Sequence, residues 1–161
     1  MRNVLIVAGL FALLSAAPAS AQVNARVPDA CSLVTAQEVR SALNVWPAFS
    51  GGGGACVHET AEMRIVVRVA RDSTPPGLEA RSFGMAEHPG PYVQVQRFGG
   101  VICSQSRPPP MRAQDGDYRT ICSVMRNRLV AAVEVTMPGP QRLVPVDRVR
   151  RLADLMARRM I

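Results

Sequence analysis

The four cysteines of this 161-residue chain follow an N-terminal segment with the pattern of a cleavable export signal, and this combination most constrains the fold. Residues 1–21 place Arg2 before a short apolar run, and the small residues Ala19 and Ala21 fit a signal-peptidase cleavage site. The apolar run is too short to span a bilayer. Exported chains fold where disulfides form and persist. We therefore expect a periplasmic or secreted protein with no integral membrane span after signal cleavage, in which residues 22–161 form a single disulfide-braced domain.

The cysteines of the mature part, Cys31, Cys56, Cys103 and Cys122, allow three connectivities. We favour Cys31–Cys56 and Cys103–Cys122, because the first pair would tie the start of a helix to a strand and the second would close the segment between two strands. No pair has the spacing of a zinc knuckle or of a Cys-x-x-Cys redox motif. The cysteines therefore predict structural disulfides, and the sequence predicts no metal site and no cofactor.

Two segments have the pattern of a helix. Thr35 and Glu38 stand at the spacing of a capping box, and the apolar residues that follow predict a helix over residues 35–44. Pro145 leads into residues 146–160, where apolar side chains recur on one arc and arginines lie mostly off it. Such a helix either packs on a sheet, which we favour, or lies on an anionic membrane surface.

Between these helices, apolar and polar residues alternate in short runs that are typical of strands. The run Gly51–Gly54 is expected to be a flexible connector. The expected strands cover residues 55–59, 63–70, 92–98, 101–103, 119–125 and 128–136. The order predicts an α+β fold, in which an antiparallel sheet of about five strands packs against an N-terminal and a C-terminal helix.

The chain has a net charge of +7, and all of its Lys and Arg positions are arginine, because it contains no lysine. A basic exported protein can meet anionic polymers or acidic proteins. Aromatic residues make up only 4% of the chain and the arginines are scattered, which does not fit a nucleic-acid binder. We therefore expect an unidentified envelope protein or anionic polymer as the partner, and no nucleic acid.

The longest polar stretch, residues 104–118, is the best candidate for recognition. Arg107 and Arg112 flank three prolines and a methionine, and prolines stiffen a chain toward polyproline II, so that it loses less entropy on binding. Arg148 and Arg151 on the closing helix form a second basic surface. The alternative is that the prolines only fill a surface loop and the arginines only face solvent.

The histidines, His58 and His88, are the candidates for catalysis or metal binding. His58 falls in an expected strand, where a place at the sheet surface is favoured, and His88 lies beside Glu87 in a stretch rich in proline and glycine. The chain has no Gly-x-Ser-x-Gly nucleophile motif. We therefore expect a non-enzymatic protein, with a small periplasmic enzyme or soft-metal carrier that uses His58 or His88 as the alternative.

Residues 28–39, with the sequence PDACSLVTAQEV, resemble the opening of small exported or lipoprotein domains of bacteria whose function is unknown. Those domains share a Cys-x-Leu-Leu-Thr-x-x-Glu-Val helix start, then a glycine-containing loop and a second cysteine, and here Gly51–Gly54 and Cys56 match that continuation. The resemblance implies an α+β domain associated with the envelope and supports the pairing of Cys31 with Cys56. It implies no catalytic residue. This chain lacks a lipobox before Cys31, so the resemblance does not extend to an acyl anchor.

Overall fold

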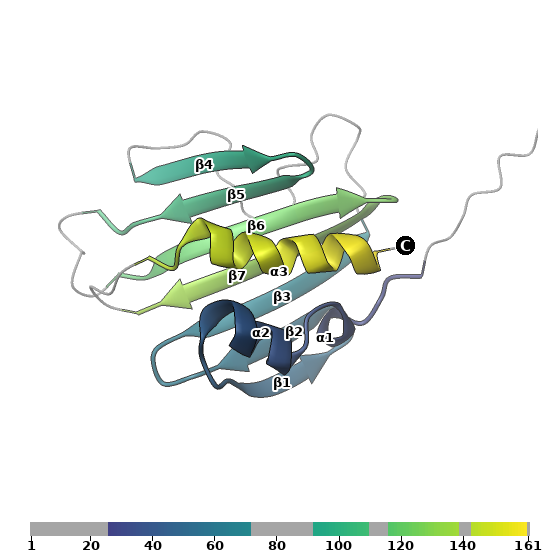
Figure 1. Cartoon of the computed structure of the whole chain (residues 1–161), viewed down its shortest axis with the longest axis horizontal. Coiled ribbons are helices and arrows are strands. Elements are labelled where there is room, and N and C mark those ends of the chain that lie inside the picture. Colours follow the sequence, from purple (N-terminus) through teal and green to yellow (C-terminus); the bar gives the residue numbers. More distant parts are fainter. Residues whose placement is uncertain (1–25, 72–91, 110–115, 139–142, 161) are drawn as a thin grey trace, which may run out of the picture.

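The computed structural model describes residues 26–71, 92–109, 116–138 and 143–160. The expected export signal, His88 and Arg112 lie outside these residues. Most of the described chain forms one antiparallel sheet in the order β1-β2-β3-β7-β6-β5-β4 (Figure 1). Its strands are β1 (Ala48–Gly52), β2 (Ala55–Glu59), β3 (Arg64–Arg71), β4 (Val93–Phe98), β5 (Val101–Ser106), β6 (Tyr118–Arg126) and β7 (Leu129–Met137).

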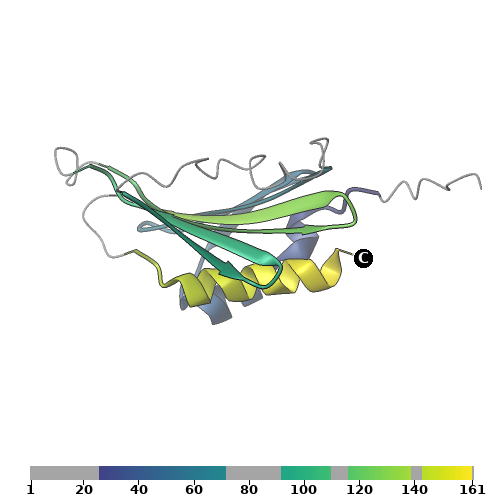
Figure 2. The same ribbon diagram turned by 90° about the horizontal axis from the view of Figure 1, so that it is seen from above.

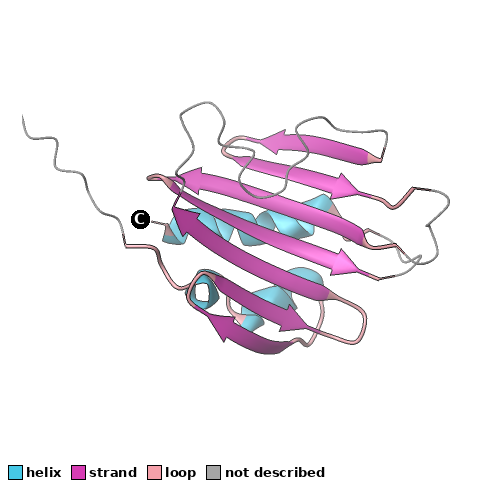
Figure 3. Ribbon diagram, turned by 180° about the vertical axis from the view of Figure 1, so that it is seen from behind, coloured by secondary structure: helices cyan, strands magenta, loops and turns pink. Residues whose placement is uncertain are grey.

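The helices of the described residues all lie on one face of the sheet, as the view along its edge shows (Figure 2). They are α1 (Ala30–Leu33), α2 (Ala36–Leu43) and α3 (Val146–Arg159). The long helix α3 crosses the middle strands, while α1 and α2 lie beside it over the β1–β3 side. From behind, the described strands carry no helix on their other face (Figure 3). The part of the chain that the structure describes thus forms two layers, with its helices on one sheet face.

The expected sheet of about five strands between one N-terminal and one C-terminal helix is wrong. The sheet has seven strands, and three short helices accompany it within the described residues. Strand β1 was missed because its second half is glycine, which gives no alternating side chains to recognise. Helix α1 was missed because it is a single turn, capped by the Asp29 side chain rather than built on an apolar repeat.

The capping box at the start of α2 is confirmed. Thr35 Oγ1 accepts a hydrogen bond from the Glu38 N–H at 3.3 Å, and the Thr35 N–H donates to Glu38 Oε2 at 2.9 Å. The helix ends at Asn44, which adopts a left-handed conformation with φ 58°. These local bonds satisfy backbone groups that a short helix leaves unpaired at its ends.

The hydrophobic core fills the space between the helices and the covered sheet face. Alternate residues of β3 and β7 point into it and are at most 3% exposed: Ile65, Val67, Val69, Leu129, Ala131, Val133 and Val135. Helix α3 contributes residues with no exposed surface: Val149, Leu152, Ala153 and Met156. The apolar arc predicted for α3 therefore packs on the sheet. The apolar stripe along the helix faces the apolar side chains that alternate along the strands.

Candidate functional site

Both predicted disulfides are confirmed, and no cysteine is free. The Cα atoms are 5.0 Å apart in Cys31–Cys56 and 4.1 Å apart in Cys103–Cys122. Cys103 lies directly opposite Cys122 in the pairing of β5 with β6. The short Cα distance is typical of opposite residues that exchange no backbone hydrogen bonds, where the side chains are closest.

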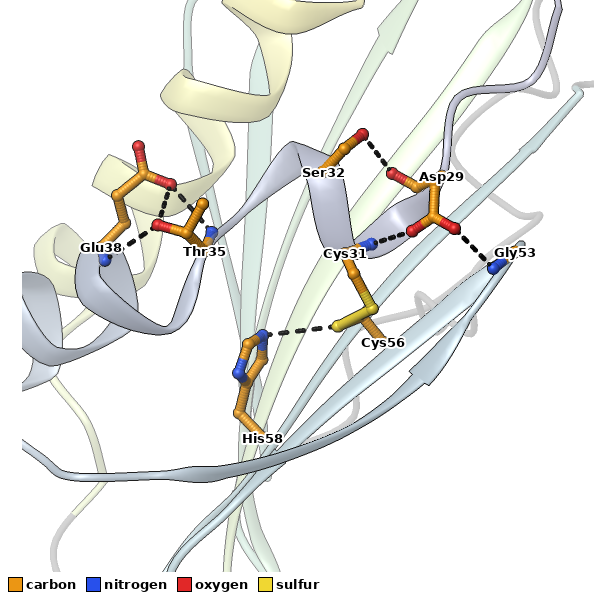
Figure 4. The surroundings of a disulfide bond; sticks show 8 residues. All are labelled: Asp29, Cys31, Ser32, Thr35, Glu38, Gly53, Cys56 and His58. Carbon is orange, nitrogen blue, oxygen red and sulfur yellow. Dashed lines mark hydrogen bonds between the residues drawn. A yellow bond between two sulfur atoms is a disulfide. The ribbon is translucent and has the colours of Figure 1, made fainter.

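The first disulfide lies in a network that fixes the glycine-rich turn against α1 (Figure 4). The Asp29 carboxylate accepts from the Gly53 N–H at 2.9 Å and from the Cys31 N–H at 2.8 Å, and these bonds lower the pKa of Asp29. The Ala30 N–H donates to the Gly53 carbonyl at 2.8 Å. The expected flexible connector is therefore a bonded β-turn between β1 and β2.

His58 is buried, so its expected place at the sheet surface is wrong. The side chain is 1% exposed, and its Nε2 lies 3.6 Å from Cys56 Sγ (Figure 4). The centre of the Phe49 ring lies 6.0 Å from that of the imidazole. Burial lowers the pKa of His58, opposed by a weaker contact with the Val34 backbone. The His58 side chain lies on the sheet face that α1 and α2 cover, as Cys56 does, which explains why a residue expected at the surface is internal. In the described residues, the imidazole lies against a disulfide sulfur and belongs to no group of three His, Cys, Asp or Glu side chains that could hold a metal ion.

Arg107 lies at the open end of the β4–β5 hairpin and lines a pocket of about 120 Å³ together with Tyr92, Gln94 and Gln105. The Arg107 N–H donates to the Tyr92 carbonyl at 3.0 Å, which closes the hairpin. Its guanidinium makes no hydrogen bond or ion pair with any residue that the structure describes. The guanidinium of Arg107 therefore keeps its hydrogen-bond donors available for a ligand, as far as the described residues are concerned.

The Gln105 side chain, which forms part of the pocket wall, is held by hydrogen bonds to residues beneath the pocket. Gln105 Nε2 donates to Thr120 Oγ1 at 3.1 Å and to the Val144 carbonyl at 2.9 Å. Thr120 Oγ1 also donates to the Val144 carbonyl, at 3.1 Å. These bonds join β5, β6 and the segment that enters α3, so the Gln105 side chain is held in one orientation.

The predicted recognition loop, residues 104–118, is shorter than expected. Ser104 and Ser106 belong to β5, and Tyr118 begins β6. Arg107 is described and Arg112 is not, so the structure does not bring the two together. The strand ends were missed because the serine and glutamine residues of β5 do not show the apolar alternation by which strands are recognised.

Arg148 and Arg151 lie on α3, exposed to solvent, and neither pairs with a described residue. Arg159 on the same helix behaves differently, because it binds Glu38 through two nitrogens at 2.6 and 2.9 Å. Arg150 lies 4.8 Å from the centre of the Phe98 ring. The arginine face of α3 is thus partly structural, and the binding role of Arg148 and Arg151 stays a prediction.

Two exposed aromatic residues at β1, Trp46 before the strand and Phe49 within it, were not predicted from the sequence. Trp46 is 73% exposed and Phe49 is 59% exposed, and the Arg40 guanidinium lies 3.4 Å from the centre of the Trp46 ring. The available signal was a single tryptophan next to Pro47, outside any strand or helix pattern. Tryptophan and arginine are enriched at interaction hot spots, so this edge is a second candidate surface.

Within the described ranges, no three His, Cys, Asp or Glu side chains come together as a metal site. None of the described helices has the length and hydropathy needed to cross a membrane. No protein-family model, curated protein or solved structure matches the chain.

Proposed function

We propose that this protein is an exported, non-enzymatic domain of the bacterial envelope that binds an anionic partner, a protein or a polymer, through the pocket around Arg107. The observation that carries this proposal is the Arg107 guanidinium, which pairs with none of the described residues and lies beside the fixed Gln105 and the 43% exposed Tyr92. Arginine binds carboxylate and phosphate groups through two parallel hydrogen bonds. Tyrosine and arginine are also the residue types enriched at the centre of protein interfaces.

The pocket is suited to binding because part of it is held in place before a ligand arrives. Ordering a long side chain on binding costs roughly 0.5–1.5 kcal/mol, and a pre-ordered wall avoids that cost. Gln105 is fixed by Thr120 and Val144, as described above. The Arg107 backbone is fixed by Tyr92, so only the guanidinium must be ordered by the partner.

The periplasmic or secreted location is supported by the two disulfides and by the sequence pattern of residues 1–21. Disulfides persist in oxidising compartments and are rare in the cytoplasm. The resemblance of residues 28–39 to exported bacterial domains points in the same direction.

The proposal is tested by capture from an envelope extract with the tagged wild-type protein, Arg107→Ala and Arg158→Ala. Arg158 is exposed on α3 and pairs with no described residue, so its variant is a control for the loss of one positive charge. Proteins or anionic polymers enriched by the wild type should also be enriched by Arg158→Ala and should be lost with Arg107→Ala. Equal recovery with all three proteins, or no recovery with any, would contradict the proposal.

The alternative function, a small enzyme or soft-metal carrier, has no supporting observation. His58 is 1% exposed and cannot reach a substrate in solvent. His88 lies outside the described residues. We therefore propose the binding function alone.

A further inference from the structure

We infer that the partner of the Arg107 pocket is an extended acidic peptide, which adds a strand to the free edge of β4. This inference rests on the proposed function, because it gives the Arg107 pocket an occupant.

Strand β4 forms one border of the sheet and, within the described residues, pairs only with β5. Its residues are intermediate or exposed throughout. A border strand presents unpaired N–H and C=O groups, and an extended peptide binds such a strand through main-chain hydrogen bonds.

The hydrogen bond from the Arg107 N–H to the Tyr92 carbonyl fixes which backbone groups of β4 are free. Opposite residues of antiparallel strands alternate between pairs that exchange hydrogen bonds and pairs that do not. Counting along the register from Tyr92, the residues Gln94, Gln96 and Phe98 bond to β5. Val93, Val95 and Arg97 consequently direct their N–H and C=O groups to the open border.

The charge along this border is positive. Residues 92–109 contain Arg97 and Arg107 and no acidic residue. Arg107 lies where the strand begins, and Arg97 lies near its end, where Arg150 of α3 also covers Phe98. On the face covered by α3, acidic side chains of an added strand would therefore meet Arg107 at one end and Arg150 at the other, while Arg97 adds a positive charge on the opposite face. Opposite charges across neighbouring strands are favourable.

The two faces of β4 also indicate the pattern of the peptide. Tyr92, Gln94 and the Arg107 pocket lie on the face covered by α3, because their neighbour Gln105 bonds to Thr120 and Val144 there. Val93 and Val95 lie on the other face. Since side chains alternate along a strand, the peptide should alternate acidic residues with apolar ones.

The other border strand, β1, is the less suitable site for this peptide. It presents the apolar Phe49 and has Trp46 beside it, and Glu59 lies opposite Ala48 in the neighbouring strand. Gly51 also has a positive φ of 116°, which breaks the regular extended backbone. An acidic peptide would find no row of cations there.

The test uses the disulfide-intact protein and a short labelled peptide that alternates Glu and Val, with binding measured by fluorescence anisotropy. Two further peptides are N-methylated on alternate residues, one on the Glu residues and one on the Val residues. In an added strand, one set of N–H groups faces β4 and the other faces solvent. One methylated peptide should therefore bind at least about tenfold more weakly than the parent, while the other should bind about as well.

Variants of β4 give the matching test on the protein. Val95→Pro removes an N–H from the open border without removing a bond to β5, whereas Val95→Ala keeps that N–H. We expect Val95→Pro to weaken peptide binding at least about tenfold and Val95→Ala to change it by less than about threefold. Thermal melting of both variants shows whether the sheet is intact; if Val95→Pro does not fold, the methylated peptides decide alone.

The outcomes separate this inference from the proposed function. Equal binding of both methylated peptides, or no binding of the parent peptide, overturns the added strand. If anionic partners captured from the envelope extract still depend on Arg107 in that case, the proposed function stands. If Arg107→Ala leaves the capture of those partners unchanged, the proposed function fails as well.

Discussion

The imidazole of His58 packs against the Cys31–Cys56 disulfide and near Phe49, and its Nδ1 has no hydrogen-bond partner among the described residues. Burial disfavours the charged form of an imidazole, and at His58 this effect is larger than the opposing contact with the Val34 backbone. Folding is therefore coupled to proton binding at this residue, because the unfolded chain takes up a proton at His58 more readily than the folded chain does.

This coupling gives a prediction with a definite sign. Burial lowers the pKa of folded His58, so its contribution to stability is complete above the unfolded value of about 6.5 and is lost as the pH falls through the folded value. The wild type should lose stability as the pH falls below about 6.5, and His58→Leu should lose less. Urea unfolding of both proteins measures this, and His88 is common to both, so its titration cancels. Parallel pH profiles would show that His58 does not titrate in this range.

At the level of the elements, the turn between β6 and β7 contains an arginine, Arg128, in a left-handed backbone conformation. Asn127 and Arg128 both have positive φ, 51° and 61°, which is the conformation of the turn that joins hairpins most often. Asparagine tolerates this conformation, but arginine pays a steric cost that glycine avoids.

Replacing this arginine should therefore stabilise the protein. We expect Arg128→Gly to raise the free energy of unfolding by about 0.5–1 kcal/mol, because glycine relieves the strain at positive φ. Arg128→Ala removes the same exposed side chain but keeps the Cβ atom, so it should give no such gain. Urea unfolding compares the three proteins. An equal gain in both variants would mean that the arginine side chain, and not its backbone conformation, is unfavourable.

The sequence predicted those elements that have a signal of their own. The capping box at Thr35 and Glu38 marked α2, and the alternation along β3 and β7 marked the central strands. Strand β1 could not be recognised in this way, because it is defined by its pairing with β2 across a glycine turn. Arg107 was predicted as a site residue because it belongs to the basic, proline-rich stretch of residues 104–118. Its neighbours Tyr92 and Gln105 were not, because they meet it only through the register of the β4–β5 hairpin.

In the whole molecule, the two disulfides support opposite sides of the sheet. Cys31–Cys56 attaches α1 to β2 near one border, and Cys103–Cys122 joins β5 to β6 near the other. The centre of the sheet, where β3 pairs with β7, has no disulfide and is held by the apolar core.

Removing either disulfide should therefore destabilise the protein to a similar extent. The paired cysteines are 25 and 19 positions apart, and loops of this size correspond to about 3 kcal/mol each if the bond acts by restricting the unfolded chain. Cys31→Ala/Cys56→Ala and Cys103→Ala/Cys122→Ala should each lower the free energy of unfolding by about that amount in urea. If one of these double variants unfolds at the same urea concentration as the wild type, the disulfide that it lacks does not contribute to stability.

The antiparallel pairing of β3 with β7 has a consequence for the order of folding. β3 ends at Arg71 and β7 begins at Leu129, so the two central strands lie far apart along the chain. Where the chain emerges with its N-terminus first, β3 can pair with β2 but must wait for β7. Until then the second edge of β3 is open to any other incompletely folded chain, which is the condition under which partly folded proteins aggregate. Completion of the sheet, and with it protection from misassembly, therefore depends on β7, the last of the described strands.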